Sequence, residues 1–155
     1  MKKILIFTAT YNEVNNIEKL IYKIKNSCSD TDILIVDDNS PDGTGKLLKE
    51  KEQKDSKLNV IVRAEKLGLD TAHKLAYDYA ITNGYDFLIT MDADLSHNPS
   101  EIPNFVKFIN NNDFVLGSRY MIGGENKIGI IRFLLSYFGN KFIKNVLNIK
   151  CTEFT

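Results

Sequence analysis

One stretch of the chain decides its fold: Asp86-Phe87-Leu88-Ile89-Thr90-Met91-Asp92-Ala93-Asp94-Leu95-Ser96-His97-Asn98-Pro99. Its apolar part has the length of a buried strand and ends at two carboxylates, Asp92 and Asp94. Side chains two residues apart on an extended backbone point to the same side, so these carboxylates can share one hard cation through oxygen ligands. Without a cation they would repel each other. A second interpretation stays open, because Asp, Ser and Asn after a strand also form turns and helix caps.

Strands and helices are expected to alternate along the whole chain. Short continuous apolar runs predict strands, and apolar residues spaced three or four apart predict helices. The predicted strands are Lys3–Thr8, Asp32–Val36, Leu58–Arg63, Phe87–Met91 and Phe114–Ser118. The predicted helices are Val14–Cys28, Gly45–Asp55, Thr71–Asn83, Ile102–Asn110 and an apolar tail, Ile128–Ile149. This alternation predicts an α/β fold with a doubly wound, mainly parallel sheet and helices on both faces.

Length and composition fit a single domain over residues 1–155, with 43% hydrophobic residues to build a core. Twenty basic residues balance twenty acidic ones, so no net charge favours nucleic acid. Cys28 and Cys151 match no metal-ligand or redox spacing, which is typical of free thiols in a reducing cytoplasm. The first apolar stretch is too short for a signal peptide, and no apolar run reaches membrane-span length. The expected location is cytoplasmic, with peripheral contact to the cytoplasmic face of a membrane.

A polar cluster lies at the carboxyl end of each of the five predicted strands. The carboxyl ends of strands in an open α/β sheet meet at one edge, where ligands bind. Each cluster alone also fits a turn or a helix start, but their convergence on one edge favours a binding crevice. The absence of a Gly-x-Gly-x-x-Gly motif after the first strand argues against a dinucleotide-dependent oxidoreductase. The five clusters are Tyr11–Glu13, Asp37–Thr44, Lys66–Asp70, Asp92–Asp94 and Gly117–Tyr120.

Several single side chains in or beside these clusters suggest roles. One carboxylate of the pair Asp37 and Asp38 is suited to accept hydrogen bonds from a base or a ribose, and Lys66 is a cation suited to a phosphate. His97 follows the two carboxylates and is interpreted as a loop histidine near the site, with a metal-binding alternative. His73 falls within a predicted helix, and we assign it no role.

Five motifs together resemble a known family. In order and spacing they resemble the family 2 glycosyltransferases, and within that family the dolichol-phosphate (polyprenyl-phosphate) mannosyltransferases. The resemblance runs from about Ile4 to Gly124, and two residues depart from the family pattern: Ala9 replaces a usual proline and Asp70 a frequent glycine. The five motifs are Thr10–Glu13, Val36–Thr44, Lys66–Leu69, Met91–His97 and Gly117–Tyr120.

The resemblance implies a GT-A fold and an inverting, metal-assisted transfer of a sugar from a nucleotide donor to a dolichyl or polyprenyl phosphate. The implied donor is GDP-mannose, and the implied cofactor is Mg²⁺ or Mn²⁺. Carried over to this chain, the metal would be held by Asp92, Asp94 and Ser96. Asp94 and Arg119 would be catalytic, and Arg119 and Arg132 would bind the acceptor phosphate. The implied donor-binding residues are Thr10, Tyr11, Glu13, Asp37, Asp38, Lys66 and Asp92.

The implied reaction needs no general base when the acceptor is a phosphate. A lipid phosphate is already anionic at neutral pH, and arginines can orient it. A saccharide hydroxyl would instead require a carboxylate base, for which Glu125 and Glu153 are the candidates after Arg119. A saccharide acceptor, another nucleotide-sugar donor and a non-catalytic nucleotide-sugar-binding fragment therefore stay open as alternatives.

The tail of the chain bears on the acceptor. Residues 128–149 are very apolar but include Arg132, Lys141 and Lys144, a pattern that fits core packing and also a basic helix lying on a membrane surface. The last residues, Cys151–Thr155, resemble only the beginning of a family segment, so the catalytic domain is expected to be incomplete at its C-terminal end. The expected partners are the nucleotide sugar, a polyprenyl phosphate at a membrane, and either a membrane-anchored protein or a missing C-terminal segment.

Overall fold

The structure is a computed structural model that describes residues 2–118 and 129–147. It divides into two compact units, residues 1–110 and residues 111–155, and each is described by itself below. Two segments named above lie outside the described residues: Arg119–Gly124, where the resemblance ends, and Cys151–Thr155. The assignment of one domain to residues 1–155 stays a prediction.

Four parallel strands form the sheet of the first unit, in the spatial order β3-β2-β1-β4. The strands are β1 (Ile4–Thr10), β2 (Asp32–Asp37), β3 (Leu58–Val62) and β4 (Phe87–Thr90). The chain adds β2 and β3 on one side of β1 and then returns to add β4 on the other side. A reversal of this kind opens a crevice between the two strands at which the order reverses, at their carboxyl ends. The crevice is therefore expected between β1 and β4.

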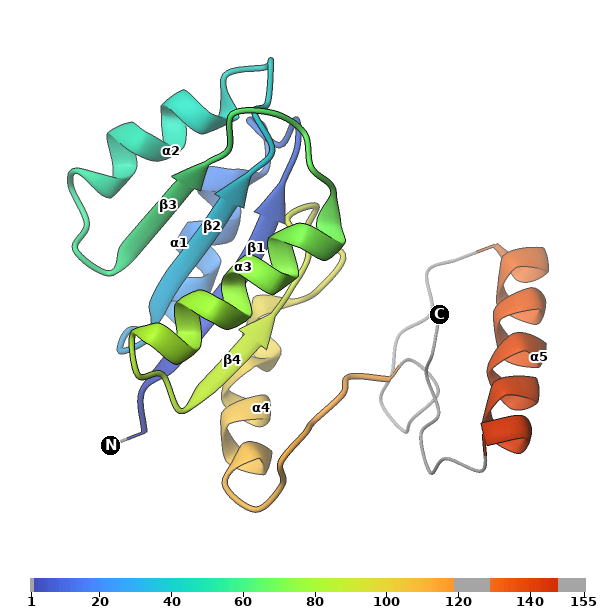
Figure 1. Ribbon diagram of the computed structural model, residues 1–155. Helices are drawn as coiled ribbons and strands as arrows, with labels where there is room; N and C mark the ends of the chain where they lie inside the picture. Colours follow the sequence, from blue (N-terminus) through green and yellow to red (C-terminus); the bar gives the residue numbers. More distant parts are fainter. Residues whose placement is uncertain (1, 119–128, 148–155) are drawn as a thin grey trace. The chain divides into compact units, whose positions relative to one another are not determined.

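Helices cover both faces of this sheet, as Figure 1 shows. Helix α1 (Ile17–Ser27), helix α2 (Thr44–Glu52) and helix α4 (Ile102–Ile109) pack on one face, and helix α3 (Leu69–Thr82) packs on the other. A short 3₁₀ helix, η1 (Pro99–Glu101), precedes α4. The predicted doubly wound parallel sheet is confirmed.

Alternation along the central strands builds the two hydrophobic layers. Successive strand residues point to opposite faces, so Ile6 lies in the layer under α1, whereas Leu5 and Phe7 lie in the layer under α3. All three are buried to at least 99%. Both faces of a parallel sheet are covered in such folds, which is why the strand sequences are continuous apolar runs. Helix α3 faces the sheet with three buried alanines, Ala72, Ala76 and Ala80.

The fifth predicted strand, Phe114–Ser118, is wrong. Residues 114–118 have no regular secondary structure, and they belong to the second unit, whereas all four strands of the sheet belong to the first. Phe114 is 78% exposed. A short apolar run forms a strand only if another strand offers it backbone hydrogen bonds. No described strand does so here. The other four strands and the five helices lie where they were predicted, with ends shifted by a few residues.

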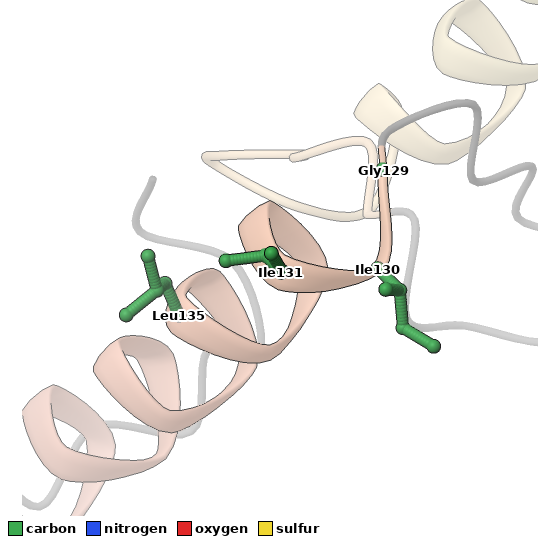
Figure 2. A pocket seen from close by; sticks show the side chains of 4 residues that line it. All are labelled: Gly129, Ile130, Ile131 and Leu135. Atoms are coloured by element: carbon green, nitrogen blue, oxygen red, sulfur yellow. The ribbon is translucent and has the colours of Figure 1, made fainter.

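The regular element of the second unit is helix α5 (Ile130–Leu147), within the predicted tail helix 128–149. Many of its apolar side chains are exposed, including Leu135 at 71% and Phe142 at 67%. At its start, Gly129, Ile130, Ile131 and Leu135 border a shallow apolar depression (Figure 2). Within the described ranges, no helix has both the length and the hydropathy that crossing a bilayer requires. Core packing and membrane contact of α5 both stay predictions.

Candidate active site

Four of the five polar clusters lie at the carboxyl edge of the sheet, as predicted. They occupy the β1–α1 loop (residues 11–16), the acidic turn after β2 (residues 38–43), the loop after β3 (residues 63–68) and the carboxylate loop after β4 (residues 91–98). Gly117 and Ser118, the described part of the fifth cluster, belong to the second unit. The candidate site is therefore built from the first unit alone.

Asp37, the last residue of β2, joins the end of β1 to the acidic turn through buried hydrogen bonds. Its side chain is fully buried, and Oδ1 accepts hydrogen bonds from the hydroxyls of Thr10 (2.9 Å) and Ser40 (2.6 Å). Oδ2 accepts the backbone N–H of Ser40 at 2.9 Å. Both oxygens of Asp37 and the hydroxyl of Thr10 are thus engaged within the protein. The donor-binding role of these two residues stays a prediction; what the structure shows is that they hold neighbouring loops together.

The acidic turn supplies hydrogen-bond acceptors to the β1–α1 loop. Three consecutive backbone N–H groups, from residues 12 to 14, donate in turn to Ser40 Oγ (2.9 Å), Thr44 Oγ1 (3.0 Å) and Asp42 Oδ2 (3.0 Å). Burial would raise the pKa of Asp42, but hydrogen bonds from Thr44 and Val14 bring it below its ordinary value. Unpaired backbone N–H groups are costly unless water or a side chain satisfies them. The two segments therefore hold each other in one conformation.

Asp38 forms a buried ion pair that the sequence analysis did not predict. The carboxylate pairs with the guanidinium of Arg63, the residue after β3, and both side chains are less than 10% exposed. Oδ2 of Asp38 also accepts the backbone N–H of Gly68 at 3.0 Å, and Arg63 donates to the carbonyl of Gly68 and the hydroxyl of Thr71. The sequence signal for this pair was a lone arginine directly after one buried strand, together with an acidic residue directly after the neighbouring strand.

Tyr11 and Lys66 meet at the open side of the edge. The ammonium of Lys66 lies 3.6 Å from the centroid of the Tyr11 ring, a cation–π contact. Tyr11 is 38% exposed, so its ring and the lysine are both accessible to a ligand. The Glu13 carboxylate accepts a hydrogen bond from the side chain of Asn16 at 2.8 Å, and the Glu13 carbonyl accepts the backbone N–H of Ile17. Glu13 therefore supports the first turn of α1.

The polar side chains of the carboxylate loop are exposed. Along the loop, buried or half-buried Met91, Ala93 and Leu95 alternate with exposed Asp92 and Asp94, and the exposed series continues to Ser96. The Ser96 backbone N–H donates to Asp94 Oδ1 at 2.8 Å. Hydrogen bonds from Ser96 lower the pKa of Asp94, so this carboxylate is ionised at neutral pH.

This loop fits a divalent cation held together with a phosphate ligand. On the described residues, no group of three or more His, Cys, Asp or Glu side chains lies close enough to form a complete metal site. Mg²⁺ bound with a phosphate ligand is usually held by one or two carboxylates, with phosphate oxygens and waters completing the shell. Two exposed carboxylates and a hydroxyl in one loop match that demand.

A recess of about 170 Å³ lies beside these carboxylates, at the crevice between β1 and β4. Phe7 and Ala9 of β1 form its floor, Asp92 and His97 lie at the carboxylate loop, and the start of α3 contributes His73 among other residues. The His73 ring packs edge-on against Phe7, with centroids 5.1 Å apart. The recess is mixed in polarity, which suits a polar ligand with an apolar face.

The predicted acceptor-binding arginines do not belong to the first unit of the chain. Arg119 lies outside the described residues, as do Glu125 and Glu153, the candidate bases for a saccharide acceptor. Arg132 falls within α5. The assignments of all four residues, and of the metal and donor ligands, stay predictions.

The four-stranded sheet with a carboxylate loop at its switch point defines the GT-A type of α/β fold. A solved structure of a mannosyltransferase from Pyrobaculum calidifontis, in complex with GDP-Man and Mn²⁺, superposes with a TM-score of 0.61 at 23% identity, covering 70% of this chain and 32% of that one. At this identity the likeness shows the fold alone.

The chain belongs to Glycosyl transferase family 2, whose profile matches residues 5–154. The undecaprenyl-phosphate mannosyltransferase of Micrococcus luteus is 31% identical over 154 residues. The polyprenol monophosphomannose synthase of Mycolicibacterium smegmatis is 33% identical over 157 residues. Each alignment covers 99% of this chain, but only 63% and 59% of the relatives' own lengths. The family resemblance stated from the five motifs is confirmed.

Proposed function

We propose that this protein transfers mannose from GDP-mannose to a dolichyl or polyprenyl phosphate, with inversion and with Mg²⁺ or Mn²⁺ bound at the carboxylate loop. The observation that carries the proposal is the placement of Asp92, Asp94 and Ser96 on the exposed side of one loop at the switch point of the sheet. The relatives that are mannosyltransferases of polyprenyl phosphates support the choice of sugar and acceptor.

The donor half of the site follows from the edge of the sheet. The accessible ring of Tyr11 and the ammonium of Lys66 lie in contact in the loops at this edge, where an aromatic face suits a base and a cation suits a phosphate. Asp92 and Asp94 would hold the metal ion, which when bound neutralises negative charge on the leaving diphosphate. The proposed role of Thr10, Asp37 and Asp38 is indirect. Their polar atoms form hydrogen bonds within the protein that hold the loops of the site in place.

The acceptor half rests on the basic residues that follow the carboxylate loop in sequence. A phosphate acceptor attacks as an anion, so it needs orientation and charge compensation more than a base. Arg119 and Arg132 are proposed to supply both. The basic, acid-free sequence of residues 130–147 suits a helix at an anionic membrane surface, so we place the reaction at the cytoplasmic face of a membrane.

The test is calorimetric titration of GDP-mannose into the full chain, first with Mn²⁺ and then with excess chelator. Binding is expected only with metal, and Asp94→Ala should weaken it by about tenfold or more. A matched variant, Asn104→Ala, removes an exposed side chain of α4 and should bind as the wild type does. UDP-glucose and UDP-N-acetylglucosamine are titrated alongside, and preference for either would replace GDP-mannose as the donor. Formation of mannosyl phospholipid from a polyprenyl phosphate then tests the acceptor.

A further inference from the structure

The second histidine of the chain is placed against the backbone of the first carboxylate. The backbone N–H of Asp92 donates a hydrogen bond to Nδ1 of His97 at 3.1 Å. The other ring nitrogen, Nε2, lies 3.6 Å from Oδ2 of the same aspartate. One imidazole thus faces both the amide and the carboxylate of Asp92, five residues earlier in the chain.

This hydrogen bond fixes which nitrogen of His97 carries the proton. A neutral imidazole has one donor and one acceptor nitrogen. Because Nδ1 accepts from Asp92, the proton lies on Nε2, on the side of the Asp92 carboxylate. Neither nitrogen then offers a free lone pair, since Nδ1 is engaged and Nε2 is protonated. The geometry therefore disfavours the metal-ligand alternative for His97.

The same contact closes a strained loop. Leu95 has φ at +65°, the left-handed region that a leucine seldom adopts, although its side chain packs against the core. Such a conformation persists only when surrounding contacts hold it. The Asp92–His97 hydrogen bond spans this residue, and the bond from Ser96 to Asp94 lies within the same span. Both carboxylates thus belong to a loop that His97 closes.

We propose that His97 is a positioning residue for the predicted metal site, and the proposal rests on the proposed function. By accepting the Asp92 amide, it holds the carboxylate loop in the conformation that keeps Asp92 and Asp94 on the exposed side. Its Nε2 faces the Asp92 carboxylate, 3.6 Å from Oδ2. A group that holds a ligand in this way typically changes metal affinity about 10- to 100-fold when it is removed.

The first measurement needs no activity, and it is made before and after metal and nucleotide are added. In ¹⁵N-labelled protein, a scalar coupling is expected between the Asp92 amide nitrogen and His97 Nδ1, because the hydrogen bond joins two nitrogens. The chain has two histidines, so His73→Phe assigns the signals. The coupling should persist when Mg²⁺ and GDP are added. Its absence from the folded wild type, or its loss on addition of Mg²⁺ and GDP, would overturn the proposal.

The second measurement compares two variants in Mn²⁺-dependent binding of GDP. His97→Phe keeps a ring but has no acceptor, and should weaken binding about tenfold or more. His97→Asn keeps an acceptor near the position of Nδ1, and should stay within about threefold of the wild type. Asn104→Ala, which removes an exposed side chain of α4 outside this loop, should bind as the wild type does.

The outcomes separate this inference from the proposed function. If the wild type binds GDP with metal but His97→Phe binds equally well, the inference fails and the proposed function stands. If His97→Asn is as weak as His97→Phe, acceptance of the Asp92 amide is not what matters, and the inference also fails. If the wild type shows no metal-dependent binding, the proposed function fails and so does the role of His97 in it, even where the coupling shows that the hydrogen bond exists.

Discussion

A Cβ atom on Gly45 would lie 2.9 Å from Oδ2 of Asp37. It would also lie 3.3 Å from both methyl carbons of Val62 on β3. The first turn of α2 therefore runs directly over the buried carboxylate that holds Thr10 and Ser40. The glycine is required by this close approach and not by its backbone conformation.

Gly45→Ala is expected to destabilise the protein. The added methyl group must displace either the Asp37 carboxylate or Val62, and overpacking of this kind costs about 1–3 kcal/mol. The measurement is the free energy of unfolding in urea. Gly139→Ala in α5, where nothing lies within 4 Å of the added carbon, is the control and should stabilise by up to about 1 kcal/mol. Equal stability of Gly45→Ala and the wild type would contradict the described approach of α2 to Asp37.

Removal of Arg63 is expected to leave an unpaired buried charge on Asp38. Arg63→Met should lower the free energy of unfolding by about 3–5 kcal/mol, and Asp38→Asn in addition should recover much of that loss. The exposed pair of Lys57 and Asp30 supplies the control: Lys57→Met should change stability by less than about 1 kcal/mol. Additive effects in the double variant would show that the two side chains do not interact.

Replacement of Lys66 is expected to weaken nucleotide binding without changing the fold. Lys66→Gln removes the cation that lies over Tyr11, and the loss of one charged contact to phosphate corresponds to about a tenfold lower affinity for GDP. Lys23→Gln, on the exposed side of α1, should leave the affinity unchanged. Calorimetric titration at low and high salt measures both variants. The salt dependence should be smaller for Lys66→Gln than for the wild type, and an identical dependence would exclude Lys66 from the site.

Acid is expected to loosen the acidic turn. The pKa of Asp42 is held below its ordinary value of 3.8 by hydrogen bonds from Thr44 and Val14. The unfolded chain therefore binds a proton more readily than the folded protein, and the stabilising contribution of Asp42 is complete above its unfolded pKa and disappears as the pH falls through the folded pKa. Urea denaturation between about pH 6 and pH 3 measures this. Asp42→Asn should reduce the slope of stability against pH in that window, and an unchanged slope would assign the effect to other carboxylates.

The sequence predicted the arrangement of the sheet because its signals are local. The continuous apolar run of β2 and the spacing of Leu20, Ile21 and Ile24 in α1 need no knowledge of the rest of the chain. The run Phe114–Ser118 shows the limit of this approach. Whether an apolar run becomes a strand depends on a partner strand elsewhere in the molecule, which a local pattern does not contain.

The sequence predicted the position of the candidate site, but only some of the roles of its residues. The convergence of four polar clusters follows from topology. The different roles of the residues within them do not, since Asp37 and Asp92 are both acidic residues at the carboxyl end of a strand, yet one is fully buried and the other is exposed. Arg63 was missed because its importance comes from the buried carboxylate on the neighbouring strand. Likewise, His97 showed its contact with the Asp92 amide only once the loop conformation was known.

The exchange of hydrogen bonds between the β1–α1 loop and the acidic turn has a consequence for protein engineering. Asn12, Glu13 and Val14 take their acceptors from a segment about thirty residues away. The two segments therefore form one transferable module. A chimera that imports only one segment from a relative is expected to lose these three hydrogen bonds. A chimera that imports both segments keeps each donor with its own acceptor. We therefore expect that the donor specificity proposed for this chain can be exchanged only with both segments together.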